Sequence, residues 1–390
     1  MIKIIRTSTV SVSMHILLKG QLKFLSNYFN VVAISSKDSY LDQTSQREGV
    51  KVIGVDMERG VSVIKDLISL FKLYIQLKNE KPTIIHSITP KAGLLSMLAG
   101  KMAGVPIRMH TFTGLIFPSR EGNMQKLLIK MDKILCWAAT NVYPEGNGVK
   151  NDLEKFKITS KTLKVLAKGN VNGIDSDYFN LKNISDEQRE ALKNNLNITG
   201  NDFVFIFVGR LVGDKGINEL ISAFKNMSLD LHNSNNVKLM LVGSSEEELD
   251  PLLDQTICEI KNNPNIISVG FQEDVRQYLA ISNALVFPSY REGFPNVVIQ
   301  AGAMELPSIV SDINGCNEII INGKNGIVIP VKNIDAIMNS MIHFLKDKEY
   351  YQKLKNNSRR LIIDRYEQSV VWNALLEEYR LLLQEKGYAV

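Results

Sequence analysis

The sequence predicts an α/β protein made of two Rossmann-like domains, each a doubly wound parallel sheet. Three observations support this fold class. The chain has 390 residues, which is more than a single hydrophobic core usually serves. Short apolar runs of strand length alternate with longer amphipathic runs, as βαβ units require. This alternation occurs twice, before and after a polar stretch at residues 180–202.

The first half contains six expected strands and the helical runs that connect them. The strands are expected at residues 2–6, 30–36, 50–56, 82–89, 107–112 and 142–146, and the helical runs at residues 14–29, 61–79, 90–103 and 122–141 and after Asn147. One helix has clear signals at both ends. Thr89 stands at its N-cap and Pro90 at its first position, and Gly104 ends it.

The second half repeats the pattern. Its strands are expected at residues 203–211, 237–243, 266–271, 284–289, 308–312 and 326–330, with helices up to Phe224, around residues 251–261 and after Asn296. We expect domains at residues 1–178 and 179–371, with a last helix at residues 372–390 packing back onto the first domain. Open parallel sheets bind ligands beyond the carboxyl ends of their strands, so a cleft between the two domains is expected to hold the site.

Several function classes are disfavoured by what the sequence lacks. Its three cysteines and five histidines show no disulfide framework and no metal-ligand spacing. No G-x-G-x-x-G follows the first strand of either half and no P-loop occurs, which disfavours the usual NAD and ATP sites. Basic runs with interleaved aromatic residues are also missing, so nucleic acid is not an expected partner. The start of the chain resembles a short strand rather than a signal peptide, and a cytoplasmic location is expected.

The charge is distributed unevenly along the chain. Residues 1–170 contain 25 Lys or Arg and 12 Asp or Glu, a net charge of +13, whereas the remainder carries −8. A basic half beside an acidic half suggests that the first faces an anionic partner. A lysine-rich solvated surface is the alternative interpretation.

A glycine-rich loop in the second half has the features of a diphosphate site. The stretch IFVGRLVGDKG ends a buried strand and precedes a helix, and Arg210 and Lys215 bracket the loop. Glycines allow the backbone to approach a ligand closely, and the start of a helix offers unpaired N–H groups. An arginine fork with a lysine point charge suits a diphosphate, unless both side chains simply extend into solvent.

The stretch YREGFPNVVIQ, residues 290–300, continues this site. A helix is expected to begin near Asn296 with its N–H groups directed toward an anion. Glu292 would repel phosphate and is better suited to accepting hydrogen bonds from sugar hydroxyls. Its alternative role is to stabilise the positive end of the helix. Gln300 could equally be an ordinary, partly exposed helix residue.

Together these motifs resemble the family 4 glycosyltransferases, which have the GT-B fold. The resemblance is carried by GRLVGDKG, by the stretch from VGFQEDV to GIVIP at residues 269–330, and in the first half by HSITPKAGLLSMLAGKMAGVP and KGNVNGIDSDYF. It covers essentially the whole chain. It is similar above all to bacterial enzymes that extend undecaprenyl-diphosphate-linked glycans.

The resemblance implies a retaining, metal-independent transfer of a hexose or N-acetylhexosamine from a nucleotide sugar, expected to be a UDP-sugar. No cofactor is implied. Arg210 and Lys215 would bind the donor diphosphate, and Glu292 would bind hydroxyls of the donor sugar. The backbone of Gly293, Phe294, Pro295, Asn296 and Val297 would add to the phosphate site, Gln300 would contact the ribose, and Gly270 and Phe271 would hold the base.

The sequence departs from the family pattern at two positions. The family's Glu-x7-Glu reads Glu-x7-Gln, so Gln300 replaces a charged acceptor with a weaker amide. After the fifth strand, HTFTG stands where many relatives have HTxHG, so Thr113 replaces a histidine expected near the reacting sugar. His110 matches the other histidine of that motif, or is a satisfied core residue at a strand end.

The first domain is expected to bind the acceptor, either an undecaprenyl-diphosphate-linked glycan or a saccharide. His86, Lys91 and His110 are candidate acceptor contacts. Within residues 108–137, four basic side chains lie near four apolar ones, which gives a hypothesis of peripheral contact with an anionic inner membrane. The basic residues are Arg120, Lys126, Lys130 and Lys133, and the apolar ones are Leu115, Ile116, Phe117 and Trp137. The alternative is that the apolar side of this helix packs into the domain core.

Two other functions remain open. A nucleotide-sugar epimerase of the same fold would need a cluster of acid and base residues in the first half, which the sequence does not show. A non-catalytic nucleotide-sugar-binding subunit is suggested by the departures at Thr113 and Gln300. The presence of Arg210, Lys215 and Glu292 together favours a transferase of bacterial surface polysaccharide synthesis, such as capsule or lipopolysaccharide.

Overall fold

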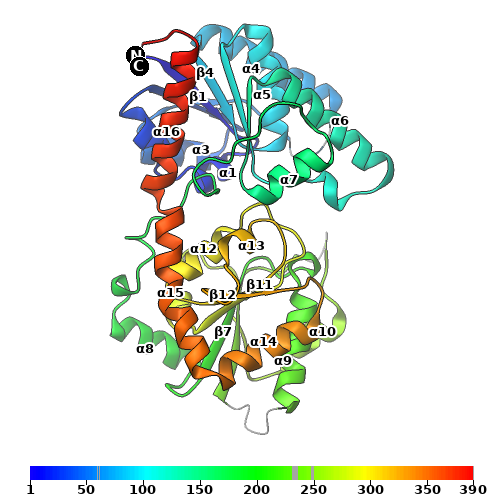
Figure 1. Ribbon diagram of the computed structural model, residues 1–390, viewed down its shortest axis with the longest axis vertical. Helices are drawn as coiled ribbons and strands as arrows, with labels where there is room; N and C mark the ends of the chain where they lie inside the picture. Colours follow the sequence, from blue (N-terminus) through cyan, green and yellow to red (C-terminus); the bar gives the residue numbers. More distant parts are fainter. Residues whose placement is uncertain (59, 61, 231–235, 247–249, 390) are drawn as a thin grey trace. The chain divides into compact units, whose positions relative to one another are not determined.

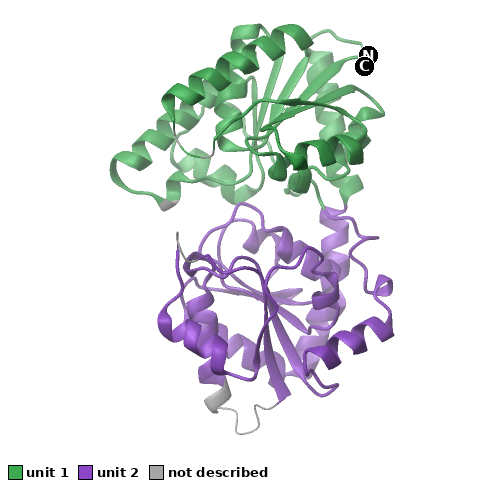
Figure 2. Ribbon diagram, turned by 180° about the vertical axis from the view of Figure 1, so that it is seen from behind, with its two compact units in different colours: residues 1–173, 368–390 green, residues 174–367 purple. Residues whose placement is uncertain are grey.

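In the computed structural model, which describes residues 1–58, 60, 62–230, 236–246 and 250–389, the chain forms two compact units. Unit 1 is Met1–Gly173 with Gln368–Val390, and unit 2 is Ile174–Glu367 (Figure 2). The chain therefore changes units after residues 173 and 367. Both positions lie a few residues before the expected boundaries at 178 and 371.

Unit 1 contains a six-stranded parallel sheet in the order β3-β2-β1-β4-β5-β6. Its strands are β1 (Lys3–Thr7), β2 (Asn30–Ser35), β3 (Lys51–Gly54), β4 (Ile84–Ser87), β5 (Ile107–Phe112) and β6 (Asn141–Pro144). The central strands are buried on both faces, as all four residues of β4 show. Valine and isoleucine dominate them because both sides of a parallel sheet are covered by helices.

The helices of unit 1 form a layer on each face of this sheet (Figure 1). They are α1 (Ser11–Leu17), α2 (Gln21–Ser26), α3 (Ser39–Glu48), α4 (Val63–Glu80), α5 (Pro90–Ala103), α6 (Gly122–Ala138), α7 (Asn147–Lys155) and α16 (Gln368–Glu385), with the 3-10 turn η1 (Phe117–Ser119). One apolar cluster joins the sheet to α4, α5 and α6. A second cluster joins it to α1, α2 and α16.

Unit 2 contains a second six-stranded parallel sheet, in the order β12-β11-β10-β7-β8-β9. Its strands are β7 (Phe203–Val208), β8 (Val237–Val242), β9 (Ile266–Ser268), β10 (Ala284–Phe287), β11 (Ser308–Ser311) and β12 (Gly326–Ile329). Its helices are η2 (Leu181–Asn183), α8 (Asp186–Asn195), η3 (Gly213–Lys215), α9 (Ile217–Asp230), α10 (Asp254–Asn262), α11 (Arg276–Ala280), α12 (Asn296–Ala303), α13 (Cys316–Ile319), α14 (Ile334–Lys346) and α15 (Lys348–Tyr366). One large apolar cluster fills both sides of this sheet.

The predicted fold class is confirmed, and the differences lie in individual helices. The helical run expected at residues 14–29 is two helices, because Gly20 adopts a left-handed φ of 80° between them. A side chain at Gly20 would also meet the Trp372 ring at 2.8 Å. The polar stretch at residues 180–202 contains α8, and the last helix starts at Gln368 rather than at residue 372.

Thr89 occupies the N-cap of α5 as predicted, but its hydroxyl does not cap the helix. It instead bonds the backbone N–H of Thr9 at 2.8 Å and the Thr9 hydroxyl at 2.7 Å. Within the described residues, no helix is both long and apolar enough to cross a lipid bilayer.

Candidate active site

The candidate donor site of unit 2 lies where four neighbouring parallel strands end. The sheet places β10, β7, β8 and β9 side by side. Their carboxyl ends lead into loops that begin at Pro288, Gly209, Gly243 and Val269. Parallel strands bring such loops to one edge of the sheet, which is where α/β proteins bind ligands.

Lys215 and Glu292 meet at this edge. The Lys215 ammonium forms an ion pair with Oε1 of Glu292, although the two residues are 77 positions apart. The same carboxylate oxygen accepts a hydrogen bond from the buried Ser289 hydroxyl at 3.0 Å. Both partners keep only 16% and 17% of their side-chain surface exposed, so the pair is shielded from much of the solvent and is stronger than a surface ion pair.

A backbone hydrogen bond and a second ion pair hold together the two loops that carry Lys215 and Glu292. The amide of Tyr290 donates to the carbonyl of Asp214 at 2.9 Å. The Arg291 guanidinium pairs with the Asp214 carboxylate at 3.0 Å. These contacts fix the loop after β7 against the loop after β10, and they orient Lys215 and Glu292 toward each other.

Glycines allow this close approach. Gly216 has a left-handed φ of 72°, and a Cβ there would lie 2.2 Å from the carbonyl oxygen of Pro288. Gly315 has a φ of 75°, and a Cβ on Gly315 would lie 2.5 Å from the carbonyl oxygen of Gly293. Any other residue at these two positions would force the loops apart.

Arg210 lies at the same edge of the sheet, but its side chain is more exposed to solvent than that of Lys215. It is exposed, and its guanidinium pairs with Glu246 at 2.5 Å. Ion pairs between exposed side chains contribute only about 0–1 kcal/mol. Replacing Glu246 by another anion at Arg210 therefore costs little.

The other predicted donor residues follow the same strands. α12 begins at Asn296 with Pro295 at its N-cap, and the Phe294 ring packs edge-on against Tyr366 at 5.5 Å. Gln300 is half-buried in α12. Gly270 has φ of 70° after β9, and the Phe271 ring is 74% exposed.

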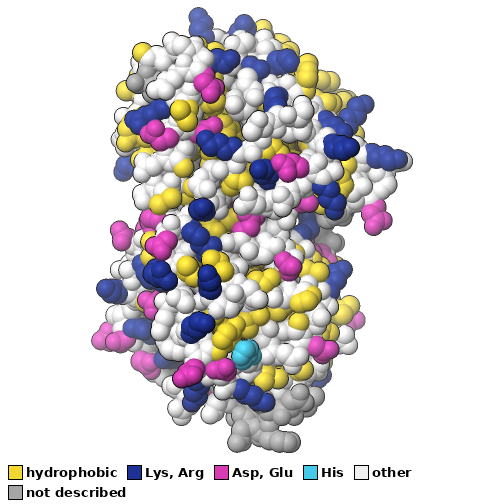
Figure 3. All heavy atoms as spheres, viewed as in Figure 1, with side chains coloured by type: hydrophobic (Ala, Val, Ile, Leu, Met, Phe, Trp, Pro, Cys, Tyr) yellow, Lys and Arg dark blue, Asp and Glu magenta, His cyan; other side chains and the backbone are white. Residues whose placement is uncertain are grey.

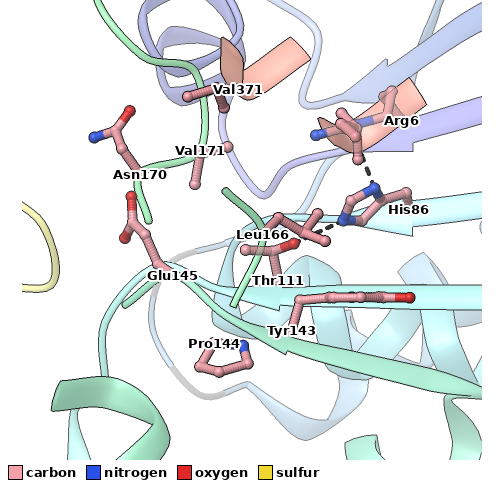
Figure 4. Close-up of a pocket in the computed structure, with 11 residues that line it drawn as sticks. Arg6, His86, Thr111, Tyr143, Pro144, Glu145, Leu166, Asn170, Val171 and Val371 are labelled. Atoms are coloured by element: carbon pink, nitrogen blue, oxygen red, sulfur yellow. Dashed lines mark hydrogen bonds between the residues drawn. The ribbon is translucent and has the colours of Figure 1, made fainter. Parts of the chain in front are cut away.

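The predicted acceptor-side histidines lie inside unit 1. His86 is buried, and its ring bonds the Thr111 hydroxyl at 2.8 Å and the buried Arg6 guanidinium at 3.2 Å (Figure 4). The ring also bonds the Tyr379 hydroxyl at 2.7 Å. Burial and the nearby Arg6 hold the pKa of His86 well below its usual range. The ring is therefore neutral and forms part of a buried polar network.

His110 is similarly enclosed at the end of β5. Its Nδ1 lies 2.8 Å from the Ser87 hydroxyl, and its ring packs edge-on against Phe112 at 4.5 Å. Burial lowers the pKa of His110 to about 3. Thr113, three residues further on, is half-buried and donates its hydroxyl proton to the carbonyl of Ile88 at 2.8 Å. These contacts favour the alternative that His110 is a core residue at a strand end.

Lys91 lines a small cavity between α5 and α6. Its ammonium pairs with Asp66 at 2.7 Å. The cavity has a volume of about 90 Å³ and is mostly apolar, with Leu94, Phe112, Leu115 and Leu128 in its wall. Asp132 also faces it, and burial raises the pKa of Asp132 to about 7.

Sequence reasoning missed several residues of the donor site. Ser289 and Asp214 position Glu292 and its loop, and Gly315 supports the start of α12. Cys316 lies beside them, where burial and the nearby Glu292 carboxylate raise the pKa of its thiol. Gly, Ser and Asp residues after the strands indicate that these loops could form a site. Their spacing in the sequence does not show which of the side chains contact one another.

In the described part of the chain, no group of three or more His, Cys, Asp or Glu side chains is placed to hold a metal ion. The charged side chains at this edge instead form ion pairs: Lys215 with Glu292, Arg210 with Glu246 and Arg291 with Asp214. Such a set suits an anionic ligand that also carries hydroxyl groups.

Comparison with known proteins identifies the family to which this chain belongs. Two family models match the chain: "Glycosyl transferases group 1" matches residues 188–361, and "Glycosyl transferase 4-like" matches residues 7–145. The capsular polysaccharide biosynthesis glycosyltransferase CapM of Staphylococcus aureus is 31% identical over 384 residues, which is 98% of either chain. An Escherichia coli relative, UDP-Gal:alpha-D-GlcNAc-diphosphoundecaprenol alpha-1,3-galactosyltransferase, is 28% identical over 306 residues, covering 78% of this chain and 77% of its own.

The fold is shared with solved structures. The crystal structure of HepE from Anabaena in complex with UDP superimposes with a TM-score of 0.79 at 16% identity, covering 97% of this chain and 100% of that one. The chain therefore belongs to the family 4 glycosyltransferases and has the GT-B fold.

Proposed function

We propose that this glycosyltransferase moves a hexose or N-acetylhexosamine from a UDP-sugar to an undecaprenyl-diphosphate-linked acceptor, with retention of configuration, in bacterial surface polysaccharide synthesis. The observation that carries the proposal is the contact between Lys215 and Glu292. In a nucleotide sugar, the diphosphate is bonded directly to C1 of the sugar. A cation for the phosphate and a carboxylate for the sugar hydroxyls must therefore lie side by side.

The other parts of the donor are assigned to residues at the carboxyl ends of the neighbouring strands. Arg210 and Lys215 bind the diphosphate together with N–H groups at the start of α12. Glu292 accepts hydrogen bonds from the sugar, and Gln300 bonds the ribose. The exposed Phe271 ring packs on the base, beside Gly270. The names of the two relatives, a capsule enzyme and a galactosyltransferase that uses UDP-Gal, support this donor and acceptor class.

The chemistry proposed for this site is charge stabilisation. As the bond between C1 and the phosphate oxygen breaks, negative charge grows on the leaving diphosphate, where Lys215 and Arg210 offset it. The acceptor hydroxyl oxygen bonds to C1 on the same face, and its proton passes to the leaving phosphate oxygen. The site residues supply this without a metal ion, so turnover should persist in excess EDTA.

The acceptor is assigned to unit 1. This unit carries the strongly basic part of the chain, which suits a lipid diphosphate. Thr113 lies half-buried after β5 and is proposed to contact the reacting sugar through its hydroxyl or backbone. We also propose a cytoplasmic position with peripheral contact at the inner face of the bacterial inner membrane, where such acceptors are anchored.

Turnover with a panel of nucleotide sugars tests the proposal. Purified protein is mixed with each donor and an undecaprenyl-diphosphate-linked monosaccharide, and the lipid products are resolved by mass. The proposal predicts that one UDP-sugar yields an acceptor heavier by one sugar. Binding of a donor without any transfer would instead indicate a non-catalytic nucleotide-sugar-binding protein, and a change of the donor sugar alone would indicate an epimerase.

A further inference from the structure

α4 exposes apolar side chains on the face opposite its buried one. Leu73 and Leu77 of this helix are buried in the core of unit 1. Six large apolar side chains nevertheless remain between 38% and 75% exposed: Val63, Ile64, Leu67, Ile68, Phe71 and Ile75. At about 100° per residue, these six fall within an arc of about 140° on the helix surface. An exposed apolar patch on a helix whose other face is already buried is typical of a protein or membrane interaction site.

The charges of α4 nearest this arc are mainly basic. Lys72 is exposed at one edge of the arc, and Lys78 is exposed at its C-terminal end. Lys65, at the same edge as Lys72, pairs with Glu58, which precedes the helix. The two acidic residues of α4 lie outside the arc and are engaged elsewhere. Asp66 pairs with Lys91, and Glu80 pairs with Lys3 and Lys51.

α6 presents a matching surface in the same helical layer. α4 packs on α5, and α5 packs on α6. Met124, Leu127, Ile134 and Trp137 of α6 are exposed, and so are Lys126, Lys130 and Lys133. Figure 3 shows Lys and Arg side chains gathered over the helix that Figure 1 labels α6. The acidic residue of α6, Asp132, instead lines the cavity beside Lys91.

We propose that the exposed faces of α4 and α6 dock unit 1 onto an anionic lipid bilayer, with the apolar arc of α4 entering the acyl boundary. Amphipathic helices of this kind lie in the membrane interface, with their apolar face buried about 5–10 Å deep. Each lysine near an anionic surface adds attraction. The inference deepens the proposed function, because a lipid-linked acceptor is anchored in that bilayer, and it adds α4 to the surface that the sequence indicated.

The charges argue against a second copy of this chain as the occupant. In a two-fold symmetric contact the same surface faces itself. The lysines of α4 and α6 would then face lysines of the other copy, and like charges oppose each other across an interface. Lipid phosphates complement the lysines, while acyl chains accept Ile64 and Phe71.

Vesicle co-sedimentation tests this surface independently of catalysis. The full-length protein is mixed with vesicles of phosphatidylcholine alone or with about 30% phosphatidylglycerol, at low and at physiological salt. We expect strong binding only to the anionic vesicles. The double variant Ile64→Glu/Phe71→Glu should lower the partition coefficient at least tenfold on them. Lys72→Gln/Lys130→Gln should lower it about 25-fold, since each lysine contributes about a factor of five.

Leu381→Glu is the matched control, because Leu381 is about half exposed on α16, which packs on the other face of the sheet. It should bind within twofold of the unchanged protein, and all variants should keep their melting temperature and their turnover of a short-chain, water-soluble acceptor. Unchanged binding of the Ile64→Glu/Phe71→Glu variant would overturn the proposal. A dimer that this variant converts to a monomer in light scattering would also overturn it, in favour of a second copy. Loss of turnover with the soluble acceptor in every protein would contradict the proposed function instead.

Discussion

At the scale of single residues, the account depends on Lys215 and Glu292. The two are distant in sequence, yet they form an ion pair at the ends of β7 and β10. Ser289 holds the carboxylate from the other side. The two proposed roles differ in charge, because a cation offsets the negative charge that grows on the leaving diphosphate, whereas a carboxylate accepts hydrogen bonds from sugar hydroxyls and would repel the phosphate.

Removing either member should therefore abolish transfer while the fold persists. We expect Lys215→Ala and Glu292→Ala each to lower kcat by roughly 10²–10³-fold or more, as loss of a charge-stabilising contact does. The control is Lys225→Ala, which breaks a surface ion pair with Glu259 in the same unit. Circular dichroism should show native helix content for all three variants, and near-normal turnover in either site variant would rule out the assigned roles.

Gln300 tests the ribose contact. Gln300→Ala should raise KM for the donor several-fold with little change in kcat, since the contact is the same in the ground and transition states. Gln300→Glu should be tolerated or should lower KM, because a carboxylate accepts a stronger hydrogen bond. Steady-state kinetics with varied donor concentration measures both. A kcat that falls while KM stays constant would place Gln300 at the reacting centre instead.

At the scale of elements, α6 carries a carboxyl group that works against the stability of unit 1. Burial raises the pKa of Asp132 to about 7, from 3.8. The folded protein thus holds a proton that the unfolded chain has already released between these two pH values. By linkage, the free energy of unfolding falls as pH rises from about 4 to about 7 and then levels off.

Asp132→Asn should remove this pH dependence. The variant should melt a few degrees above the unchanged protein at pH 8, where the buried charge opposes folding, and the difference should vanish near pH 4. Both proteins keep the buried His86 and His110, whose pKa values are lowered. As pH falls below about 6.5, these histidines lower the free energy of unfolding of both proteins equally. The difference in melting temperature between the two proteins therefore reports Asp132 alone. Equal melting temperatures at pH 8 would show that the Asp132 carboxyl is well solvated.

At the scale of the whole molecule, the alternation of strands and helices could be predicted because buried parallel strands appear as apolar runs. The strand β7, FVFIFV, is the clearest example. α8 could not be recognised by hydrophobicity, since none of its residues is buried and a capping box formed by Ser185 and Gln188 marks its start. The break between α1 and α2 depends on Gly20 and the distant Trp372, a tertiary contact that local patterns do not reveal.

The candidate site was predictable to the extent that it follows strand ends. Arg210 and Lys215 lie in the segment that follows β7 and Glu292 lies in the loop that follows β10, and the sheet order then brings these two segments together. The burial of His86 and His110 was not predictable, because a histidine at a strand end has the same sequence signature whether it faces the core or a ligand. The exposed apolar side of α4 was not predictable either, because a helix with apolar residues on both faces has the same sequence pattern as a helix buried in a core.

The most direct test of the account is transfer of one sugar to an undecaprenyl-diphosphate-linked acceptor, followed by mass spectrometry of the lipid product. We predict that one UDP-sugar of the panel adds a single sugar, that the new linkage keeps the anomeric configuration of the donor, and that Glu292→Ala forms product at least about 10²-fold more slowly. An inverted linkage, or full product formation by Glu292→Ala, would contradict this prediction.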